Sequence, residues 1–410
     1  MVEIDDGQDD LRVVSGLAVP RVGAVIRGPG RGVPWRLVDA DGTDVTAAQR
    51  WLAELHANGN PGTTLRAYAY DLLNWLRFLD VIGVDWKYAT RTEVRDWVRW
   101  HLENPNHQRR RGNGDHPHRP APGAINEKTG KPYLDDAYAR ATINRQLSAI
   151  SGFYEYAIET DVGPMVNPVP RSRSELARAY ARVSPNEPRR TKRAPYRQKI
   201  VQRAPRALSD ELYEDVFTAL TCNRDRAIVA SAVSSGMRAG ELLSMRRGLL
   251  HAGNHTAEVI PKGGGGERVL VRLSPSAFVW IARYLAERPP GPADEPVWMT
   301  RRGSPRPLTY WALRRILERT NAVIGSNVTM HDFRHTFCMR LAADDNLTVA
   351  EMQELMRHAA LDSTMVYLRA NPDDLITKLQ EHWNRPPMPP PSPAQGYAAE
   401  DLRVLFGGDD

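Results

Sequence analysis

The chain has 410 residues, of which 41% are hydrophobic and 25% charged, and it carries a formal net charge of +6. A single hydrophobic core usually divides beyond about 250 to 300 residues, so this length predicts at least two domains. No run of about 18 apolar residues occurs and the N-terminus MVEIDDGQDD is acidic, which argues against a membrane span or a secretory signal and leads us to expect a cytoplasmic protein.

The N-terminal part predicts an arm followed by a helical bundle. Residues 1–44 are rich in Gly and Pro without a helical period, so we expect a small extended arm. From Thr46 the apolar residues recur at helical spacing, and Thr46 with Gln49 forms a predicted capping box. The same period predicts further helices at 64–82, 94–98 and 143–154. These helices predict an all-α domain over residues 45–170.

Two basic segments accompany this bundle. Residues 104–132 form an insert with Arg109–Arg111 and three histidines, which we interpret as a basic loop because no carboxylate or Cys cluster completes a metal site. Residues 171–206 hold twelve Lys or Arg against two Glu, a local excess of ten that is larger than the net charge of the whole chain. We expect an interdomain linker, either solvated or following a phosphate backbone through Arg189, Arg190, Lys192 and Arg193.

A second domain is predicted over residues 207–385. It begins with a helix capped by Ser209, and after two more helices a β-hairpin is predicted from 258–262 and 268–273 around a Gly-rich turn. Later helices are expected at 274–287, 309–322, 331–343, 348–358 and 362–369. Residues 386–410 are Pro-rich and predict a tail. The expected fold is multidomain and mainly α, with a helical bundle preceding a mixed α/β domain that has a small antiparallel sheet.

Four segments of the second domain resemble, in order, the motifs of the tyrosine recombinase family of integrases and transposases. SGMRAGEL at 235–242 resembles the first arginine box, and Lys262 before a Gly-rich turn resembles the hairpin lysine. HDFRH at 331–335 is similar to the H-x-x-R-H box, and LMRH at 355–358, followed nine residues later by Tyr367, is similar to the last box. The bundle in front resembles the core-binding, SAM-like domain of this family.

One position departs from the family pattern. The family usually has Gly immediately before the final histidine, and this chain has Arg357. If that position needs φ > 0, Arg strains it, and the loop that presents His358 is expected to differ in shape.

The resemblance implies a set of catalytic residues, which are Arg238, Lys262, His331, Arg334, His358 and Tyr367. It also implies Glu241 as a support that orients Arg238. A guanidinium can grip two non-bridging phosphate oxygens, and histidines can bond the phosphate or carry the tyrosine proton. The nucleophile Tyr367 would conserve the phosphodiester energy as a 3′-phosphotyrosine, so no ATP, metal or other cofactor is expected.

Lysine usage gives a separate reason to single out Lys262. Only 7 of the 55 basic residues are Lys, so the chain uses Arg for about seven of every eight positive charges. An ammonium can release a proton and a guanidinium essentially cannot, which favours Lys262 as the acid for the departing 5′ oxygen. The alternative is an ordinary lysine in a turn.

Metal binding is the main alternative for the histidines. His331 and His335 stand four residues apart, but Arg334 lies between them and no acidic third ligand is apparent, so we interpret His335 as a structural neighbour of His331. The cysteines, Cys222 and Cys338, match no zinc or disulfide spacing and are expected to be free thiols.

The resemblance also implies partners. These are double-stranded DNA recombination sites, three further copies in a homotetramer on paired sites, and a directionality or accessory protein, with no membrane. Residues 373–383 would dock on a neighbouring copy or pack within their own chain. Two other functions stay open, a catalytically silent DNA-binding accessory protein and a type IB topoisomerase. The expected location is the cytoplasm, with nucleoid association when the protein is bound to DNA.

Overall fold

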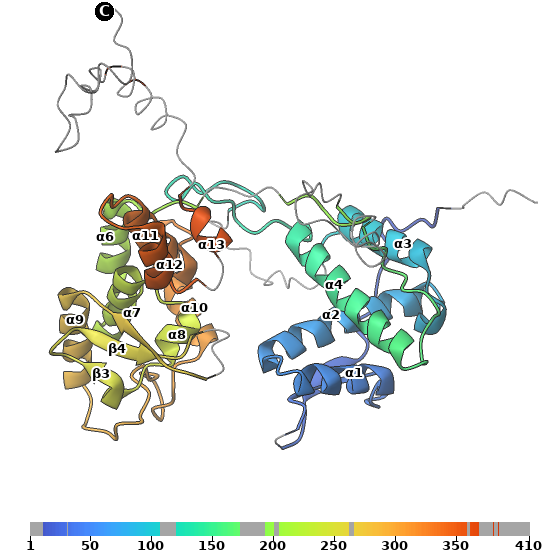
Figure 1. Ribbon diagram of the computed structural model, residues 1–410, viewed down its shortest axis with the longest axis horizontal. Helices are drawn as coiled ribbons and strands as arrows, with labels where there is room; N and C mark the ends of the chain where they lie inside the picture. The colour runs from blue at the N-terminus through green and yellow to red at the C-terminus, as the bar shows by residue number, and fades with distance from the viewer. Residues whose placement is uncertain are drawn as a thin grey trace, which may run out of the picture. The chain divides into compact units, whose positions relative to one another are not determined.

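The chain forms two compact units, which we describe separately (Figure 1). One unit comprises residues 1–203 with 325–327, and the other comprises 204–324 with 328–410. The computed structural model describes residues 11–30, 32–106, 120–172, 193–200, 205–261, 266–358, 361–368, 380 and 384.

The first unit is a helical bundle, as the apolar periods predict. Its elements are α1 (Thr46–Ala57), α2 (Gly62–Val81), η1 (Trp86–Tyr88), α3 (Arg91–Glu103) and α4 (Arg140–Glu159). Its core is aromatic: the fully buried Trp75 lies edge-on to Trp97 and donates a hydrogen bond to the Tyr154 hydroxyl at 3.0 Å. That hydroxyl in turn donates to the Trp86 carbonyl at 2.9 Å, so the buried Trp75 indole and Tyr154 hydroxyl both have hydrogen-bond partners.

An antiparallel hairpin from the predicted arm completes this core. Strand β1 (Ala24–Arg27) pairs with β2 (Trp35–Val38), and the paired residues Val25 and Leu37 are both buried in the aromatic core. The Leu37 carbonyl accepts from the Val45 N–H at 3.0 Å, which keeps Val45 extended as the N-cap of α1. The predicted Thr46–Gln49 capping box is therefore wrong, because α1 begins at the hairpin edge and Thr46 is already helical.

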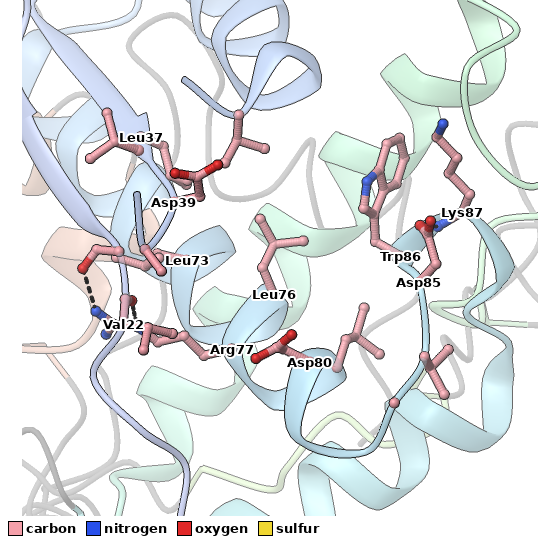
Figure 2. Close-up of a pocket in the computed structure, with 17 residues that line it drawn as sticks. Val22, Leu37, Asp39, Leu73, Leu76, Arg77, Asp80, Asp85, Trp86 and Lys87 are labelled. Carbon is pink, nitrogen blue, oxygen red and sulfur yellow. Dashed lines mark hydrogen bonds between the residues drawn. The ribbon is translucent and has the colours of Figure 1, made fainter. Parts of the chain in front are cut away.

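An open depression of about 540 Å³ lies between the hairpin, α2 and η1 (Figure 2). Arg77 of α2 closes one side by donating hydrogen bonds to the carbonyls of Val22 and Gly23 at 2.5 and 2.8 Å. None of the motif residues lines this depression.

The second unit contains the predicted mixture of helices and one small sheet. Its elements are α6 (Asp210–Ala219), α7 (Asn223–Ser235), α8 (Ala239–Leu243), η2 (Arg247–Leu249), β3 (Leu250–His251), β4 (Thr256–Val259), β5 (Val269–Arg272), α9 (Pro275–Ala286), α10 (Tyr310–Ile324), α11 (Met330–Ala342), α12 (Val349–Met356) and α13 (Asp362–Met365). Ser209 caps α6 as predicted, accepting from the Leu212 N–H at 3.2 Å. The predicted hairpin is present as β4 and β5, and β3 adds an antiparallel third strand in the order β3-β4-β5.

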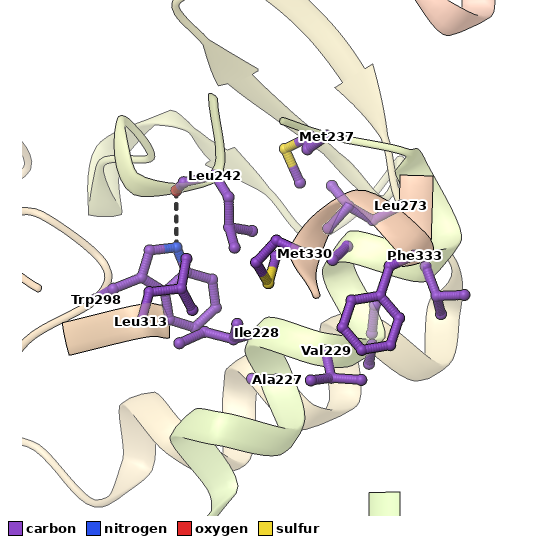
Figure 3. Packing of buried hydrophobic residues seen from close by; sticks show 14 of the residues in the cluster. Ala227, Ile228, Val229, Met237, Leu242, Leu273, Trp298, Leu313, Met330 and Phe333 are labelled. Carbon is purple, nitrogen blue, oxygen red and sulfur yellow. Dashed lines mark hydrogen bonds between the residues drawn. The ribbon is translucent and has the colours of Figure 1, made fainter. Parts of the chain in front are cut away.

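Helix α7 forms the centre of this unit. Ten of its thirteen residues are buried, because it packs against α9 on one side and α11 on another. The surrounding core includes Trp298, whose indole N–H donates to the Leu242 carbonyl at 2.8 Å (Figure 3). Phe333 of α11 and Met237 after α7 are fully buried in the same core, so the first and third motifs are held by one packed body.

Several predictions fall on residues outside the described ranges. These are the role of Lys262, the contacts of Arg189, Arg190 and Lys192, most of the basic stretch 107–120 of the insert, nearly all of segment 373–383, and the tail 386–410. Arg193 is described and exposed. No helix in the described part of the chain is long and apolar enough to cross a membrane.

Candidate active site

The first arginine of the site stands between α7 and α8. Gly236 ends α7 in the left-handed region with φ of 59°, and the turn delivers Arg238 as the N-cap of α8. The Arg238 Nη1 donates to Glu241 Oε1 at 2.7 Å, and the Arg238 backbone N–H donates to Glu241 Oε2 at 3.0 Å. Both carboxylate oxygens of Glu241 therefore contact Arg238.

The Glu241 carboxylate is almost fully enclosed, with 1% of its side chain exposed. Burial alone would raise its pKa, but the hydrogen bond from the Arg238 backbone and the charge of Arg357 outweigh burial and lower the pKa of Glu241 below its ordinary value. The carboxylate is accordingly ionised at neutral pH and acts as a fixed anion among arginines.

The second arginine, Arg334, is buried on α11. A capping box between Thr329 and Asp332 sets the start of this helix, with the Thr329 N–H donating to the Asp332 carboxylate at 2.7 Å. The Arg334 guanidinium donates to the Gly236 carbonyl at 2.6 Å and to the Met356 carbonyl. Arg334 thus ties the end of α7 to the end of α12.

The end of α12 presents His358. Its helix stops in a Schellman motif, in which the His358 N–H donates to the Gln353 carbonyl at 3.1 Å and the Arg357 N–H donates to the Glu354 carbonyl at 2.9 Å. Arg357 has φ of 53° and ψ of 49°, so the position that the family pattern gives to Gly does adopt the left-handed conformation here with an Arg.

His358 sits in a strongly positive environment. Its Nδ1 lies 3.0 Å from the Thr364 hydroxyl. Burial, together with the charges of Arg334, Arg238 and Arg357, lowers the pKa of His358 to about 4. His358 is therefore neutral at pH 7.

Tyr367 lies against two histidines. Its hydroxyl is 2.8 Å from His335 Nδ1, and its ring lies nearly parallel to that of His358 with centroids 6.0 Å apart. His335 also contacts His331, with ring centroids 4.2 Å apart. Burial and the neighbouring Cys338 raise the pKa of Tyr367 above its ordinary value, so the phenol is protonated at neutral pH.

Contacts, several of them through Arg357, Met356 and His335, therefore connect five of the six residues of the predicted catalytic set. We call this group the site cluster; its members are Arg238, His331, Arg334, His358 and Tyr367. The sixth residue, Lys262, lies outside the described residues.

Sequence reasoning missed some partners of the site cluster. The buried guanidinium of Arg357 and the carbonyls of Gly236 and Met356 hold the arginines, and no motif signals such contacts. His335, interpreted as a structural neighbour of His331, also hydrogen-bonds Tyr367, a contact that no motif signals. In the described part of the chain, no group of three or more His, Cys, Asp or Glu side chains is arranged to hold a metal ion.

Comparisons of sequence place both units in one family. The sequence profile described as Phage integrase family matches residues 208–373, and that described as Phage integrase, N-terminal SAM-like domain matches residues 48–110. The tyrosine recombinase XerC of Bacillus pumilus is 27% identical over 271 residues, which cover 62% of this chain and 79% of that protein. Tyrosine recombinase XerD of Lacticaseibacillus casei is 30% identical over 159 residues, 37% of this chain and 53% of XerD, so that alignment spans about half of the relative.

Solved structures share the fold. The Tn1549 transposon integrase in complex with circular intermediate DNA has a TM-score of 0.52 at 15% identity, covering 81% of this chain and 98% of that chain. The XerH recombinase bound to palindromic difH substrate has a TM-score of 0.51 at 17% identity, covering 84% and 90%. With two profiles of one family matching in the expected order, and with the motif residues gathered in one unit, this chain belongs to the phage integrase family of tyrosine recombinases.

Proposed function

We propose that this protein is a site-specific DNA recombinase, an integrase or tyrosine transposase, that breaks and rejoins DNA strands through Tyr367. The observation that carries the proposal is the placement of the Tyr367 hydroxyl, 2.8 Å from His335 and beside His358, within the site cluster. The family membership, and the circular intermediate DNA bound by the Tn1549 transposon integrase, support the choice of substrate.

The reaction is a transesterification. The Tyr367 oxygen attacks the scissile phosphorus, the bond from phosphorus to the 5′ oxygen breaks, and a 3′-phosphotyrosine and a free 5′ hydroxyl result. The tyrosine proton must leave as the new bond forms, and His335 Nδ1 is already within hydrogen-bond distance to receive it. Lys262 supplies the proton that the departing 5′ oxygen takes up. Reversal of these steps with a different 5′ hydroxyl joins a new pair of strands.

Charge favours this chemistry. Arg238 and Arg334 serve as donors to the non-bridging oxygens, because their guanidinium groups stay charged throughout. The low pKa of His358, about 4, reports the burial and the positive field into which the phosphate would move. A neutral His358 can donate a hydrogen bond to a phosphate oxygen, and it does not repel the neighbouring arginines as a charged imidazolium would.

The decisive experiment is trapping of the covalent adduct on a nicked suicide duplex. Tyr367→Phe should bind duplex as well as the unchanged protein does and form no adduct, because only the nucleophilic oxygen is removed. Tyr213→Phe is the matched control, since Tyr213 lies in the same unit on α6 and packs against Phe217. An adduct that persists in Tyr367→Phe would overturn the assignment, and adduct formation should continue in EDTA.

The role of Lys262 is tested with a substrate whose bridging 5′ oxygen is replaced by sulfur. Thiolate is a good leaving group without protonation, so Lys262→Ala should lose about 10²- to 10⁴-fold on normal DNA and recover most of that rate on the sulfur substrate. Arg238→Ala should not recover. If sulfur does not rescue Lys262→Ala, or if Lys262→Arg is fully active on normal DNA, Lys262 is a phosphate contact and not the acid.

The assembly and the alternatives are tested with the same protein. A homotetramer on two paired sites predicts a complex of four chains and two duplexes in analytical ultracentrifugation. Relaxation of a plasmid without any recombination site would favour a topoisomerase, and binding without adduct would favour an accessory protein. Alanine at Arg189, Arg190, Lys192 and Arg193 should weaken binding to all sequences and flatten its salt dependence if this run contacts phosphates.

A further inference from the structure

Arg357 occupies a backbone position that disfavours it. Among the described residues, four that are not Gly have positive φ: Asp161, Tyr196, His255 and Arg357. A side chain in the left-handed region brings its Cβ close to the following carbonyl, which is why Gly or Asn usually ends a helix in this way. Something in the fold must therefore hold Arg357 in place.

The Arg357 side chain makes four polar contacts inside the protein. Only 14% of it is exposed. Its Nε and Nη2 each lie 3.3 Å from Glu241 Oε2. Its Nη2 also donates to the Ser235 carbonyl at 3.1 Å, and its Nη1 donates to the Leu355 carbonyl at 3.0 Å. These contacts join the end of α12 to the turn between α7 and α8.

Arg357 also contacts Arg238 through its backbone. The Arg357 carbonyl accepts from Arg238 Nη1 and Nη2 at 3.3 and 3.4 Å. Glu241 Oε1 accepts a hydrogen bond from Arg238, and Glu241 Oε2 accepts one from Arg357. A single carboxylate therefore lies between two guanidinium groups. The position of Arg238 thus depends on a carboxylate and a carbonyl, and Arg357 fixes both.

We propose that Arg357 is a positioning residue, whose guanidinium holds Glu241 and whose left-handed backbone aims its carbonyl so that Arg238 is aligned for the scissile phosphate. This inference rests on the proposed recombinase function. It assigns a role to the side chain at a position where the resemblance leads us to expect glycine, which has none. Four of the five N–H donors of Arg357 face Glu241 and two carbonyls inside the protein, so we assign the side chain no phosphate contact.

The alternative is that Arg357 merely ends α12 and that its side chain compensates for the strained backbone. The two readings differ in what Arg357→Gly should do. Glycine relieves the strain and keeps the Schellman motif, so a helix-ending role predicts full activity. A positioning role predicts loss of activity, because Glu241 loses one partner and Arg238 loses part of its alignment.

The test is single-turnover adduct formation at saturating suicide duplex, with the dissociation constant measured on the same duplex. Arg357→Gly should form adduct about 10- to 100-fold more slowly, the range seen when residues that orient metal ligands are lost, with an unchanged dissociation constant. Arg357→Lys should be intermediate, since one ammonium cannot reach Glu241 and both carbonyls together. Arg340→Ala is the control: it removes an exposed positive charge, paired with Asp210, from the same unit and should be fully active.

The pH profile tests whether the charge of Arg357 acts on His358, and the rate at saturating duplex tests positioning. Arg357 is one of the charges that lower the pKa of His358, so Arg357→Gly should shift the acid limb of the rate profile upward in pH. A wild-type rate and acid limb in Arg357→Gly would overturn the proposal. If Arg357→Gly does not fold, Arg357→Lys decides by the same two measurements. If the unchanged protein forms no adduct at all, the proposed function fails instead of this inference.

Discussion

Both the fold and the site cluster depend on Gly236, and Gly236→Ala tests that dependence. Gly236 has φ of 59°, and a Cβ built on it would lie 2.3 Å from Cδ1 of Phe337. The left-handed conformation costs an L residue about 1 to 2 kcal/mol, and overpacking costs about 1 to 3 kcal/mol more. The expected loss of unfolding free energy is therefore about 2 to 5 kcal/mol.

Gly240 provides a matched control four residues away. It lies within α8, and a Cβ there would meet no heavy atom within 4 Å. Gly240→Ala should therefore leave stability unchanged or raise it by about 0.5 to 1 kcal/mol, since alanine favours a helix. Calorimetry of the second unit should show a melting temperature lower by about 4 to 20 °C in Gly236→Ala, at roughly 2 to 4 °C per kcal/mol.

The two contributions at Gly236 can be separated. Phe337→Ala in the Gly236→Ala background removes the ring that the new methyl meets. The part of the loss in unfolding free energy that comes from overpacking should therefore be recovered, whereas the part that comes from the left-handed backbone should remain. Adduct formation should slow as well, because the Gly236 carbonyl anchors Arg334 at 2.6 Å. Equal melting temperatures for Gly236→Ala and Gly240→Ala would refute the reasoning from φ and packing together.

Two further predictions follow from the histidines. His101 is fully buried, and its burial lowers its pKa from 6.5 to about 4. The unfolded chain therefore takes up the proton first, and the unfolding free energy falls as pH drops from 6.5 towards 4. The pKa difference of 2.5 corresponds to at most about 3 kcal/mol of unfolding free energy. Urea unfolding between pH 7 and 4 should show this extra loss in the unchanged protein and not in His101→Phe, and parallel curves would contradict it. His335→Gln should keep a hydrogen bond to Tyr367 but accept no proton, so its single-turnover adduct formation should slow and recover as pH rises. A wild-type rate in His335→Gln at neutral pH would mean that His335 only orients the hydroxyl.

The helices could be predicted because their signals are local. Ser209 caps α6, and the apolar period of α2 matches its buried face, since both depend on residues within one or two turns. The start of α1 was mispredicted for the opposite reason. Val45 is held extended by the Leu37 carbonyl, a hairpin contact that the spacing of Thr46 and Gln49 does not encode.

The residue types of the site cluster could be predicted from motifs, but their partners could not. The Arg357 guanidinium meets Glu241 across 116 positions of sequence, and His335 meets Tyr367 across 32. Such contacts depend on how α7, α11 and α12 pack, and a motif records only which residues are present. The resemblance did indicate that Arg357 was unusual, because a left-handed position is a local requirement.

The charges of the described site suit the negative charge that develops on the phosphate. Arg238, Arg334 and Arg357 contribute three positive charges and Glu241 one negative, so these four groups sum to +2 while His358 is neutral. A phosphodiester carries one negative charge. The pentavalent species formed when Tyr367 passes its proton to His335 carries two, and the transferred proton places a compensating positive charge on His335 beside it. Fixed positive groups interact more strongly with the second state than with the first, and interactions that strengthen in this way accelerate the reaction. Arg357 adds one positive charge to this field without a phosphate contact of its own, so its removal should slow the chemical step more than it weakens DNA binding.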